Sequence, residues 1–213
     1  PVPAAAESSF PLLQHEGVLS GYADGSFQLW KPITRAEAIK VLVTSDGTLR
    51  DEADAAQRHL HPTVETAEGQ QWYAPYLRVA TTRKLVHGLP DGSLRLHSPL
   101  PVAEAVTLLH RFARVSRPVP FLTSSYLRNK EGEWYTEAMS NAIARKLVTE
   151  PLELSEPIRR GQFFAMVERL RVAERNQSFA YDAMAHQWRQ QDERLSIASR
   201  NPFTITIPAL HLE

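Results

Sequence analysis

The sequence contains no cysteine. Disulfide bonds, thiolate metal sites and a cysteine nucleophile are therefore excluded, and the lack of thiols suits an exported protein. Neither sign of charge is in excess, because 24 lysine and arginine residues balance 24 aspartate and glutamate residues. We therefore expect no binding to nucleic acid or to an anionic membrane through bulk charge.

Long hydrophobic runs are also missing. No stretch of about 18 apolar residues occurs, so no membrane-inserted segment is predicted. Residues 1–9 lack the basic and apolar regions of a signal peptide, and their Pro/Ala-rich composition is typical of a linker. Any export signal is expected to have been removed or to lie outside the 213 residues. Hydrophobic residues make up 43% of the chain, which is enough to bury a core without cross-links.

What the sequence does contain is an internal repeat. Residues 17–37 (GVLSGYADGSFQLWKPITRAE) align with residues 84–104 (KLVHGLPDGSLRLHSPLPVAE) at an offset of 67. A third copy at 146–162 (KLVTEPLELSEPIRRGQ) keeps the pattern but loses the Asp-Gly turn, so its loop is four residues shorter. Upstream, WYAPYLRVATTRKLV matches WYTEAMSNAIARKLV at an offset of 62. Each unit is predicted to be a helix, a turn and a second helix.

The first helix of each unit has one apolar face. Two sets of residues recur at helical spacing and carry this face, and we expect both tryptophans to lie in the core. These sets are Trp72, Tyr76, Leu77 and Ala80 in one unit and Trp134, Ala138, Met139 and Ala142 in the next.

The second helix of each unit has a start signal and a matching apolar column. Thr34 and Glu37 have the spacing of a capping box, so second helices are predicted to begin near Thr34, Pro101 and Arg160. Equivalent apolar columns should pack these three helices against one another. The columns are Ile39 and Leu42, Val106 and Leu109, and Phe164 and Val167.

The pattern G-Y-x-D-G-x-F followed by P-I-T-R-A-E, at residues 21–37, resembles the S-layer homology (SLH) motif. The resemblance extends over residues 5–172 as three tandem repeats. It implies a mainly α fold: a pseudo-threefold trimer of repeats with a central three-helix bundle, peripheral helices and grooves between lobes. The chain then divides into a linker with repeat one (1–50), repeat two (51–116), repeat three (117–175) and a C-terminal tail (176–213).

The resemblance also implies a function, which is non-covalent anchoring at the outer surface of the cell wall. The ligand would be a wall polymer, either a pyruvylated secondary polysaccharide or a modified peptidoglycan, bound in the grooves without a cofactor. No nucleophile elbow, phosphate loop or paired-acid motif indicates catalysis. Two alternatives stay open: a degenerate SLH scaffold for protein contacts, and the targeting part of a sortase-like envelope enzyme whose catalytic domain follows residue 213.

In SLH domains the arginine of T-R-A-E helps to hold a carboxylate of the ligand. By resemblance that arginine is Arg35 in copy one and Arg160 in copy three, whereas copy two has Val102. A guanidinium can donate two parallel hydrogen bonds to a carboxylate, and the helix dipole assists an anion at a helix start. One functional groove, bordered by copy one, is expected. Further ligand-binding candidates are the turn residues Gly21, Asp24, Gly25, Ser26, Asp91 and Gly92, and Trp30 as a platform for a sugar ring.

Each of these residues also has a purely structural interpretation. Thr34 and Glu37 can be only a cap, the Asp-Gly pairs are ordinary turn residues, and Arg35 can be a surface charge on a helix. His59 and His61, with three nearby acids, Asp51, Glu52 and Asp54, are the residues that could hold a metal. No further ligand has diagnostic spacing, so no metal is predicted.

The C-terminal tail has a different pattern from the repeats. Residues 169–199 are polar with a few apolar positions at helical spacing, which predicts one long helix or two helices broken near Asn176. Residues 203–210 alternate as a strand, which we expect to pair with a following domain or with the N-terminal segment.

Overall fold

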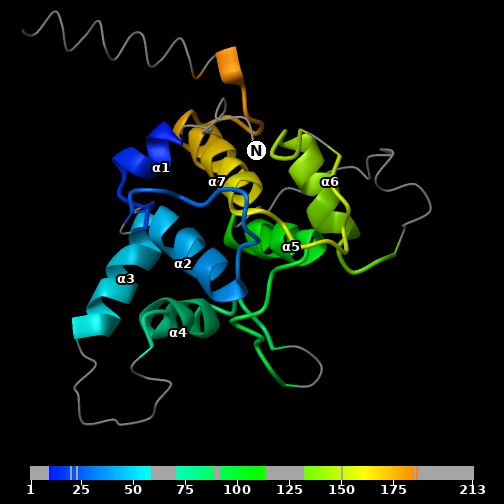
Figure 1. Ribbon diagram of the computed structural model, residues 1–213. Coiled ribbons are helices and arrows are strands. Elements are labelled where there is room, and N and C mark those ends of the chain that lie inside the picture. Colours follow the sequence, from blue (N-terminus) through cyan, green and yellow to red (C-terminus); the bar gives the residue numbers. More distant parts are fainter. Residues whose placement is uncertain are drawn as a thin grey trace, which may run out of the picture.

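A computed structural model describes residues 10–19, 21–22, 24–58, 71–88, 92–113, 132–149, 151–184 and 186. These ranges contain seven helices and no named strand, which confirms the prediction of a mainly α fold (Figure 1). The helices are α1 (Pro11–His15), α2 (Arg35–Ser45), α3 (Gly47–Arg58), α4 (Ala74–Thr82), α5 (Val102–Phe112), α6 (Thr136–Ala144) and α7 (Arg160–Arg175).

Helices α2, α5 and α7 begin where the sequence predicts. The Thr34 hydroxyl accepts a hydrogen bond from the Glu37 N–H at 3.3 Å, and the Glu37 carboxylate accepts one from the Thr34 N–H at 2.9 Å. The capping box is therefore confirmed. At the start of α7, the Arg159 N–H donates to the side-chain oxygen of Gln162 at 3.0 Å, which reproduces half of this arrangement without a hydroxyl.

The segments that precede these three helices pair in a closed ring. The Ile33 N–H donates to the Ile158 carbonyl at 3.0 Å, the Ile158 N–H to the Leu100 carbonyl at 2.9 Å, and the Leu100 N–H to the Ile33 carbonyl at 2.9 Å. These residues hold equivalent positions in the three copies, and none is more than 1% exposed. A second layer of bonds runs around the ring in the opposite direction, from the amides of Arg35, Val102 and Arg160 to the carbonyls of Ser98, Glu156 and Lys31.

The core is built on the helices that leave this ring. Helix α2 packs against both α5 and α7 (Figure 1). The starts of α5 and α7 are joined by the pairing of Pro101 with Pro157. The predicted apolar columns are buried, since Ile39, Leu42, Val106, Leu109, Phe164 and Val167 are each at most 1% exposed.

The peripheral helices surround this core. Helix α4 contacts α2 and α3, α6 contacts α5, and α1 contacts α7. Helices α1, α4 and α6 are each followed by a residue of positive φ. The N–H of the next residue then donates a hydrogen bond to a carbonyl in the last turn of the helix. Those residues are Gly17 (φ 68°), Lys84 (55°) and Lys146 (56°), and the bonds run from Val18 to Leu13, Leu85 to Ala80 and Leu147 to Ala142. The chain thus leaves all three helices in the same way.

The prediction that Trp72 and Trp134 lie in the core is wrong. Their side chains are 50% and 62% exposed, because each tryptophan precedes its helix instead of lying on the helical stripe. The next residues, Tyr73 and Tyr135, are buried in their place. Each indole stands edge-on to its neighbouring tyrosine, with ring centres 5.4 Å apart.

Helix α7 ends at Arg175, so the helical pattern is interrupted near Asn176, as the alternative with a broken helix predicted. Gln177 follows the last turn with a φ of 54°, and the chain then contacts the end of α6. There the Arg145 Nε donates to the Phe179 carbonyl at 3.1 Å, and the Tyr181 N–H donates to the Arg145 carbonyl at 3.0 Å. The predicted linker (1–9), the helix beyond residue 186 and the strand at 203–210 lie outside the described residues. Among the residues described, no helix has the length and apolar character needed to cross a membrane.

Candidate functional site

Two arginine–glutamate pairs lie where the central helices begin. Arg160, the first residue of α7, places its Nη1 2.6 Å from a carboxylate oxygen of Glu37 in α2. Arg35, the first residue of α2, pairs in the same way with Glu104 in α5. The partners hold equivalent positions in the repeat, so this is one contact formed at two successive interfaces. At the third interface the equivalent positions are Val102 and Gln162.

Arg160 is held from several sides. Its Nε donates to the Phe27 carbonyl at 3.0 Å, and its guanidinium lies 5.1 Å from the ring centre of Tyr22 and 5.2 Å from that of Phe164. The side chain is only 12% exposed, so the guanidinium is partly dehydrated as well as fixed in direction. A fixed, poorly hydrated guanidinium is well suited to a charged oxygen.

Arg160 opens onto a pocket of about 290 Å³. The turn of copy one supplies one wall, with Gly21, Tyr22 and Phe27, and α7 supplies the other. Trp72, which is half exposed, lies at the pocket with Lys40, whose ammonium is 5.9 Å from the indole centre. The lining contains two cations, Arg160 and Lys40, and one carboxylate, Glu37, so it carries one excess positive charge.

The turn of copy one depends on two glycines. Gly21 has a φ of 66°, and a Cβ there would lie 3.4 Å from the Ser26 carbonyl oxygen and 3.5 Å from the Phe27 ring. Gly25 has a φ of 77°, and its N–H donates to the Tyr22 carbonyl at 2.8 Å. This tight turn is what brings Tyr22 and Phe27 against Arg160.

Asp24 closes the same turn and does not line the pocket. Its carboxylate accepts hydrogen bonds from the Ser26 hydroxyl at 2.7 Å and the Ser26 N–H at 2.9 Å. These bonds hold the pKa of Asp24 below its usual value. Asp24, Gly25 and Ser26 therefore shape the wall of the pocket from outside.

Tyr22 adds a polar group to the pocket. Its hydroxyl lies 3.4 Å from the Glu37 carboxylate. Burial raises the pKa of Tyr22, and the nearby Arg160 only partly offsets this effect. The hydroxyl therefore keeps its proton at neutral pH and can donate a hydrogen bond.

The remaining candidates are distributed elsewhere. Arg35 is 7% exposed, so the interpretation as a surface charge is wrong, and it does not line the Arg160 pocket. Trp30 is 62% exposed and lines a different groove. Gly92 adopts a φ of 76° in the turn of copy two, whereas Asp91 lies outside the described residues.

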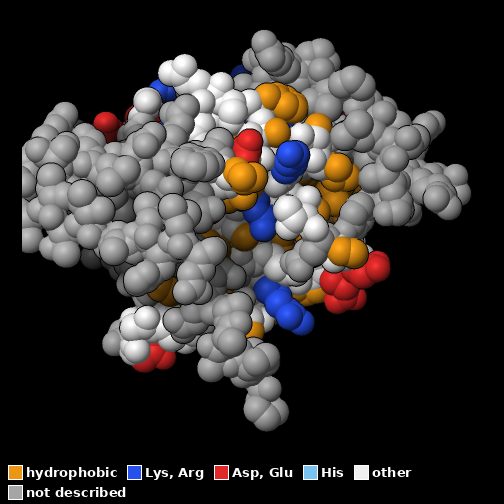
Figure 2. Space-filling view, turned by 90° about the horizontal axis from the view of Figure 1, so that it is seen from above, with side chains coloured by type: hydrophobic (Ala, Val, Ile, Leu, Met, Phe, Trp, Pro, Cys, Tyr) orange, Lys and Arg blue, Asp and Glu red, His pale blue; other side chains and the backbone are white. Residues whose placement is uncertain are grey.

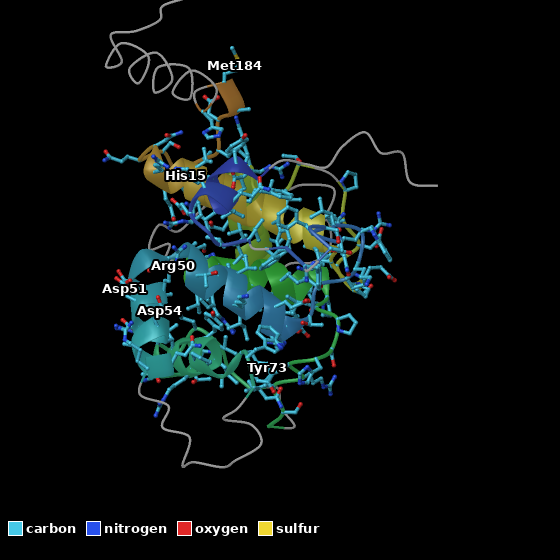
Figure 3. All side chains as sticks on the ribbon, turned by 60° about the vertical axis from the view of Figure 1, so that its left-hand side comes forward. His15, Arg50, Asp51, Asp54, Tyr73 and Met184 are labelled. Carbon is cyan, nitrogen blue, oxygen red and sulfur yellow. The ribbon has the colours of Figure 1, made fainter. Side chains whose placement is uncertain are left out.

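The candidate metal ligands that lie within the described residues do not converge on one point. In Figure 3 Asp51 and Asp54 point outward from α3. Glu52 forms an ion pair with Arg83, which follows the end of α4. No group of three potential ligands occurs within the described ranges. His59 and His61 are not among the described residues.

Sequence reasoning missed Tyr22, Lys40 and Trp72, which line the pocket together with Arg160, and identified Glu37 only as a cap. One signal could have revealed the Glu37 contact. Copy two loses the arginine and copy three loses the glutamate, which become Val102 and Gln162, and a paired loss across neighbouring copies indicates a contact between them.

On the face seen from above in Figure 2, the coloured lysine and arginine side chains lie among hydrophobic ones and do not form a broad basic patch. Recognition of an anion at a local pocket therefore fits this surface better than attraction by bulk charge.

Comparison with known proteins finds one family model and several similar surface proteins. The family model for the S-layer homology domain matches residues 12–39, which run from α1 through the turn into α2. The surface layer protein of Brevibacillus choshinensis is 34% identical over 108 residues, 51% of this chain and 9% of that protein. The middle cell wall protein of Brevibacillus brevis is 29% identical over 169 residues, 78% of this chain and 14% of that protein.

The cellulosome-anchoring protein of Acetivibrio thermocellus is 25% identical over 162 residues, covering 73% of this chain and 36% of that protein. The chain thus spans only a minor part of each of these relatives. Residues 12–39 match the S-layer homology domain, and the chain is similar to bacterial surface-layer and cell-wall proteins.

Proposed function

We propose that this chain is a non-catalytic module that holds a surface protein on the outside of the cell wall, by binding an acidic wall polymer in the pocket around Arg160. Three SLH repeats related by a pseudo-threefold axis would form the module. The closed ring of backbone bonds through Ile33, Leu100 and Ile158 supports this architecture, because it joins the same position of every copy in cyclic order.

The observation that carries the proposal is the setting of Arg160. Its guanidinium is fixed by Glu37, the Phe27 carbonyl and two aromatic rings, at a pocket with one excess positive charge. A ligand carboxylate, such as the ketal pyruvate of an acidic wall polysaccharide, would complete the hydrogen bonding of the guanidinium. The exposed ring of Trp72 offers a flat apolar surface to the attached sugar.

The Arg35 interface is the weaker candidate for the same ligand. The neighbouring groove, of about 740 Å³, is lined by Glu104, Glu153 and Trp134, and Arg35 is not part of its lining. Two carboxylates repel an anion, so we expect one dominant site, at the border between copies three and one. Gly21 would contact the ligand directly, while Asp24, Gly25 and Ser26 would hold the turn that shapes the wall.

Sedimentation with purified bacterial cell walls tests this proposal. Arg160→Gln should weaken binding about ten- to a hundredfold, the value of one charge-assisted contact. Arg35→Gln should weaken it less. The matched control is Arg78→Gln, an exposed arginine on α4 that lines none of the three pockets described here.

Walls extracted with hydrofluoric acid, which removes polymers attached to peptidoglycan, separate the two ligand classes. Loss of binding after extraction supports a secondary polysaccharide, whereas unchanged binding identifies peptidoglycan as the ligand. If folded Arg160→Gln binds untreated walls as tightly as the wild type, the proposed site is wrong.

A further inference from the structure

The groove of about 740 Å³ between copies two and three differs in charge from the Arg160 pocket. The described residues that line it include two carboxylates, Glu104 and Glu153, and no lysine, arginine or histidine. Glu104 pairs with Arg35, whereas Glu153 is exposed and has no ion-pair partner among the described residues. No described residue lines both this groove and the Arg160 pocket, so the two can be occupied independently.

Trp134 lies in this groove as Trp72 lies in the Arg160 pocket. The two tryptophans are equivalent in the repeat, and each indole stands edge-on to the tyrosine that follows it, with ring centres 5.4 Å apart. Helix α6 packs against α5 as α4 packs against α2. The two indoles therefore hold matching places beside successive central helices.

One of these indoles has a cation beside it and the other does not. The Lys40 ammonium of α2 lies 5.9 Å from the centre of the Trp72 ring. At the repeat offset of 67 the equivalent of Lys40 is Thr107 in α5, whose hydroxyl donates to the Ala103 carbonyl of its own helix at 2.8 Å. No lysine or arginine within the described ranges lies over Trp134, which is 62% exposed. The ring that a lysine covers at one interface is thus open at the next.

We propose that this groove binds the ammonium group of a lysine side chain from a partner polypeptide, with the ammonium over the Trp134 ring and beside Glu153. The contact of Lys40 with its own tryptophan shows which group the equivalent ring accepts within this chain. Leu152 and Leu154 supply an apolar wall for the methylene stem of a lysine, which an amino sugar lacks. A groove of about 740 Å³ has room for this side chain and its flanking backbone.

The test follows the indole N–H resonance of Trp134 in proton–nitrogen correlation spectra, assigned with Trp134→Phe. The probes are Nα-acetyl-lysine methylamide, the same compound acetylated at Nε, and glucosamine. The lysine probe should shift the resonance to saturation, with a dissociation constant on the order of millimolar. Acetylation at Nε removes the charge and should weaken binding about tenfold. Glucosamine keeps an ammonium but has no methylene stem, so it should bind at least about fourfold more weakly than the lysine probe.

Two variants locate the site. Thr107→Lys should supply an ammonium from α5, cover the Trp134 ring and weaken binding of the lysine probe about tenfold. Glu153→Gln, at an exposed position, should weaken it about threefold without an effect on folding. Asp51→Asn removes an exposed carboxylate on α3 and is the charge-matched control, which should leave the titration unchanged. Arg160→Gln should also leave it unchanged while reducing sedimentation with walls, so failure here and failure of the proposed function are distinguishable.

Three results would overturn the inference. The first is a lysine probe that does not shift the Trp134 resonance, or that binds no more tightly than its Nε-acetylated form. The second is glucosamine that binds as tightly as the lysine probe, which would assign the groove to an amino sugar instead of a polypeptide. The third is a lysine titration that survives intact in both Thr107→Lys and Glu153→Gln.

Discussion

Two interfaces between the central helices carry an arginine–glutamate pair, and the third carries Val102 and Gln162. The backbone ring is nevertheless complete at all three. The Val102 N–H bonds the Glu156 carbonyl at 3.0 Å, as the Arg35 N–H bonds the Ser98 carbonyl at 3.2 Å. Backbone pairing and apolar packing therefore hold the third interface without ions. The ion pairs at the other two interfaces are therefore not needed to close the ring.

The energetics of partly buried ion pairs explain how both kinds of interface can coexist. Removing two charges from water offsets much of their mutual attraction, so a matched neutral pair is nearly as stable. A single unmatched charge is the costly state. The paired replacement in copies two and three agrees with this rule, because neither a lone arginine nor a lone glutamate is left at the third interface.

Placing one charge at the neutral interface should give the largest effect. Val102 is 2% exposed, so Val102→Arg should lower the free energy of unfolding by about 3 kcal/mol or more. Adding Gln162→Glu should recover most of that loss by recreating the pair seen at the other two interfaces. Urea denaturation of both variants measures this. If the double variant is no more stable than the single one, the three interfaces are not equivalent in geometry.

Removing an existing pair should give the next largest effect. In a double-mutant cycle of Arg35→Met and Glu104→Met, we expect a coupling energy of about 1–2 kcal/mol, because the Arg35 side chain is only 8% exposed. The matched cycle of Val102→Ala and Gln162→Ala should show coupling near zero. Equal coupling in the two cycles would contradict the distinction between charged and neutral interfaces.

Much of this fold follows from the sequence alone, because local signals agree with the repeat. The capping box at Thr34 and the three apolar columns fixed where α2, α5 and α7 begin and which sides they bury. The prediction failed at Trp72 and Trp134, where helical spacing was extended past the helix start into a turn. Periodicity alone does not locate the first residues of α4 and α6, which have no side-chain cap. Helices α5 and α7 also lack such a cap, but their starts align with the capped start of α2.

The site was harder to predict than the fold. Sequence alignment groups Arg35 with the turn at Gly21, since both belong to copy one. In the structure the cyclic packing brings Arg160 of copy three to that turn instead, and Arg35 meets Glu104 of copy two. Residues of one pocket thus come from different copies, and no pattern within a single copy can show this. The role of each candidate as a ligand contact stays a prediction.

A smaller effect should come from the Thr34 cap, a feature that α2 has and that α5 and α7 lack. Thr34→Ala removes the hydroxyl that accepts the Glu37 N–H and should cost about 1 kcal/mol of stability. Thr34→Ser keeps the hydroxyl and is the control, with a loss of only a fraction of that. Thermal unfolding followed by circular dichroism distinguishes them. If both variants lose the same stability, packing of the threonine methyl matters more than the cap.

The smallest effect should be a pH dependence at a glutamate that has no arginine partner among the described residues. Glu168 of α7 is buried, and its two oxygens accept the N–H groups of Leu12 and Leu13 at the start of α1, each at 2.9 Å. Burial raises the pKa of Glu168 above its ordinary value of 4.5, against the two hydrogen bonds and the nearby charge of His186 that lower it, while Glu16 adds to the rise.

The folded chain therefore holds the Glu168 proton more tightly than the unfolded chain does. The stability linked to this proton is fully present below pH 4.5 and is lost as the pH rises through the raised pKa of the folded state. Glu168→Gln cannot titrate, so the free energy of unfolding of the wild type, taken relative to this variant, should fall as the pH rises from below 4.5 to neutral. Urea denaturation across this range measures the difference. A difference that rises with pH would mean that the two amides of α1 stabilise Glu168 as a carboxylate more strongly than burial opposes its charge.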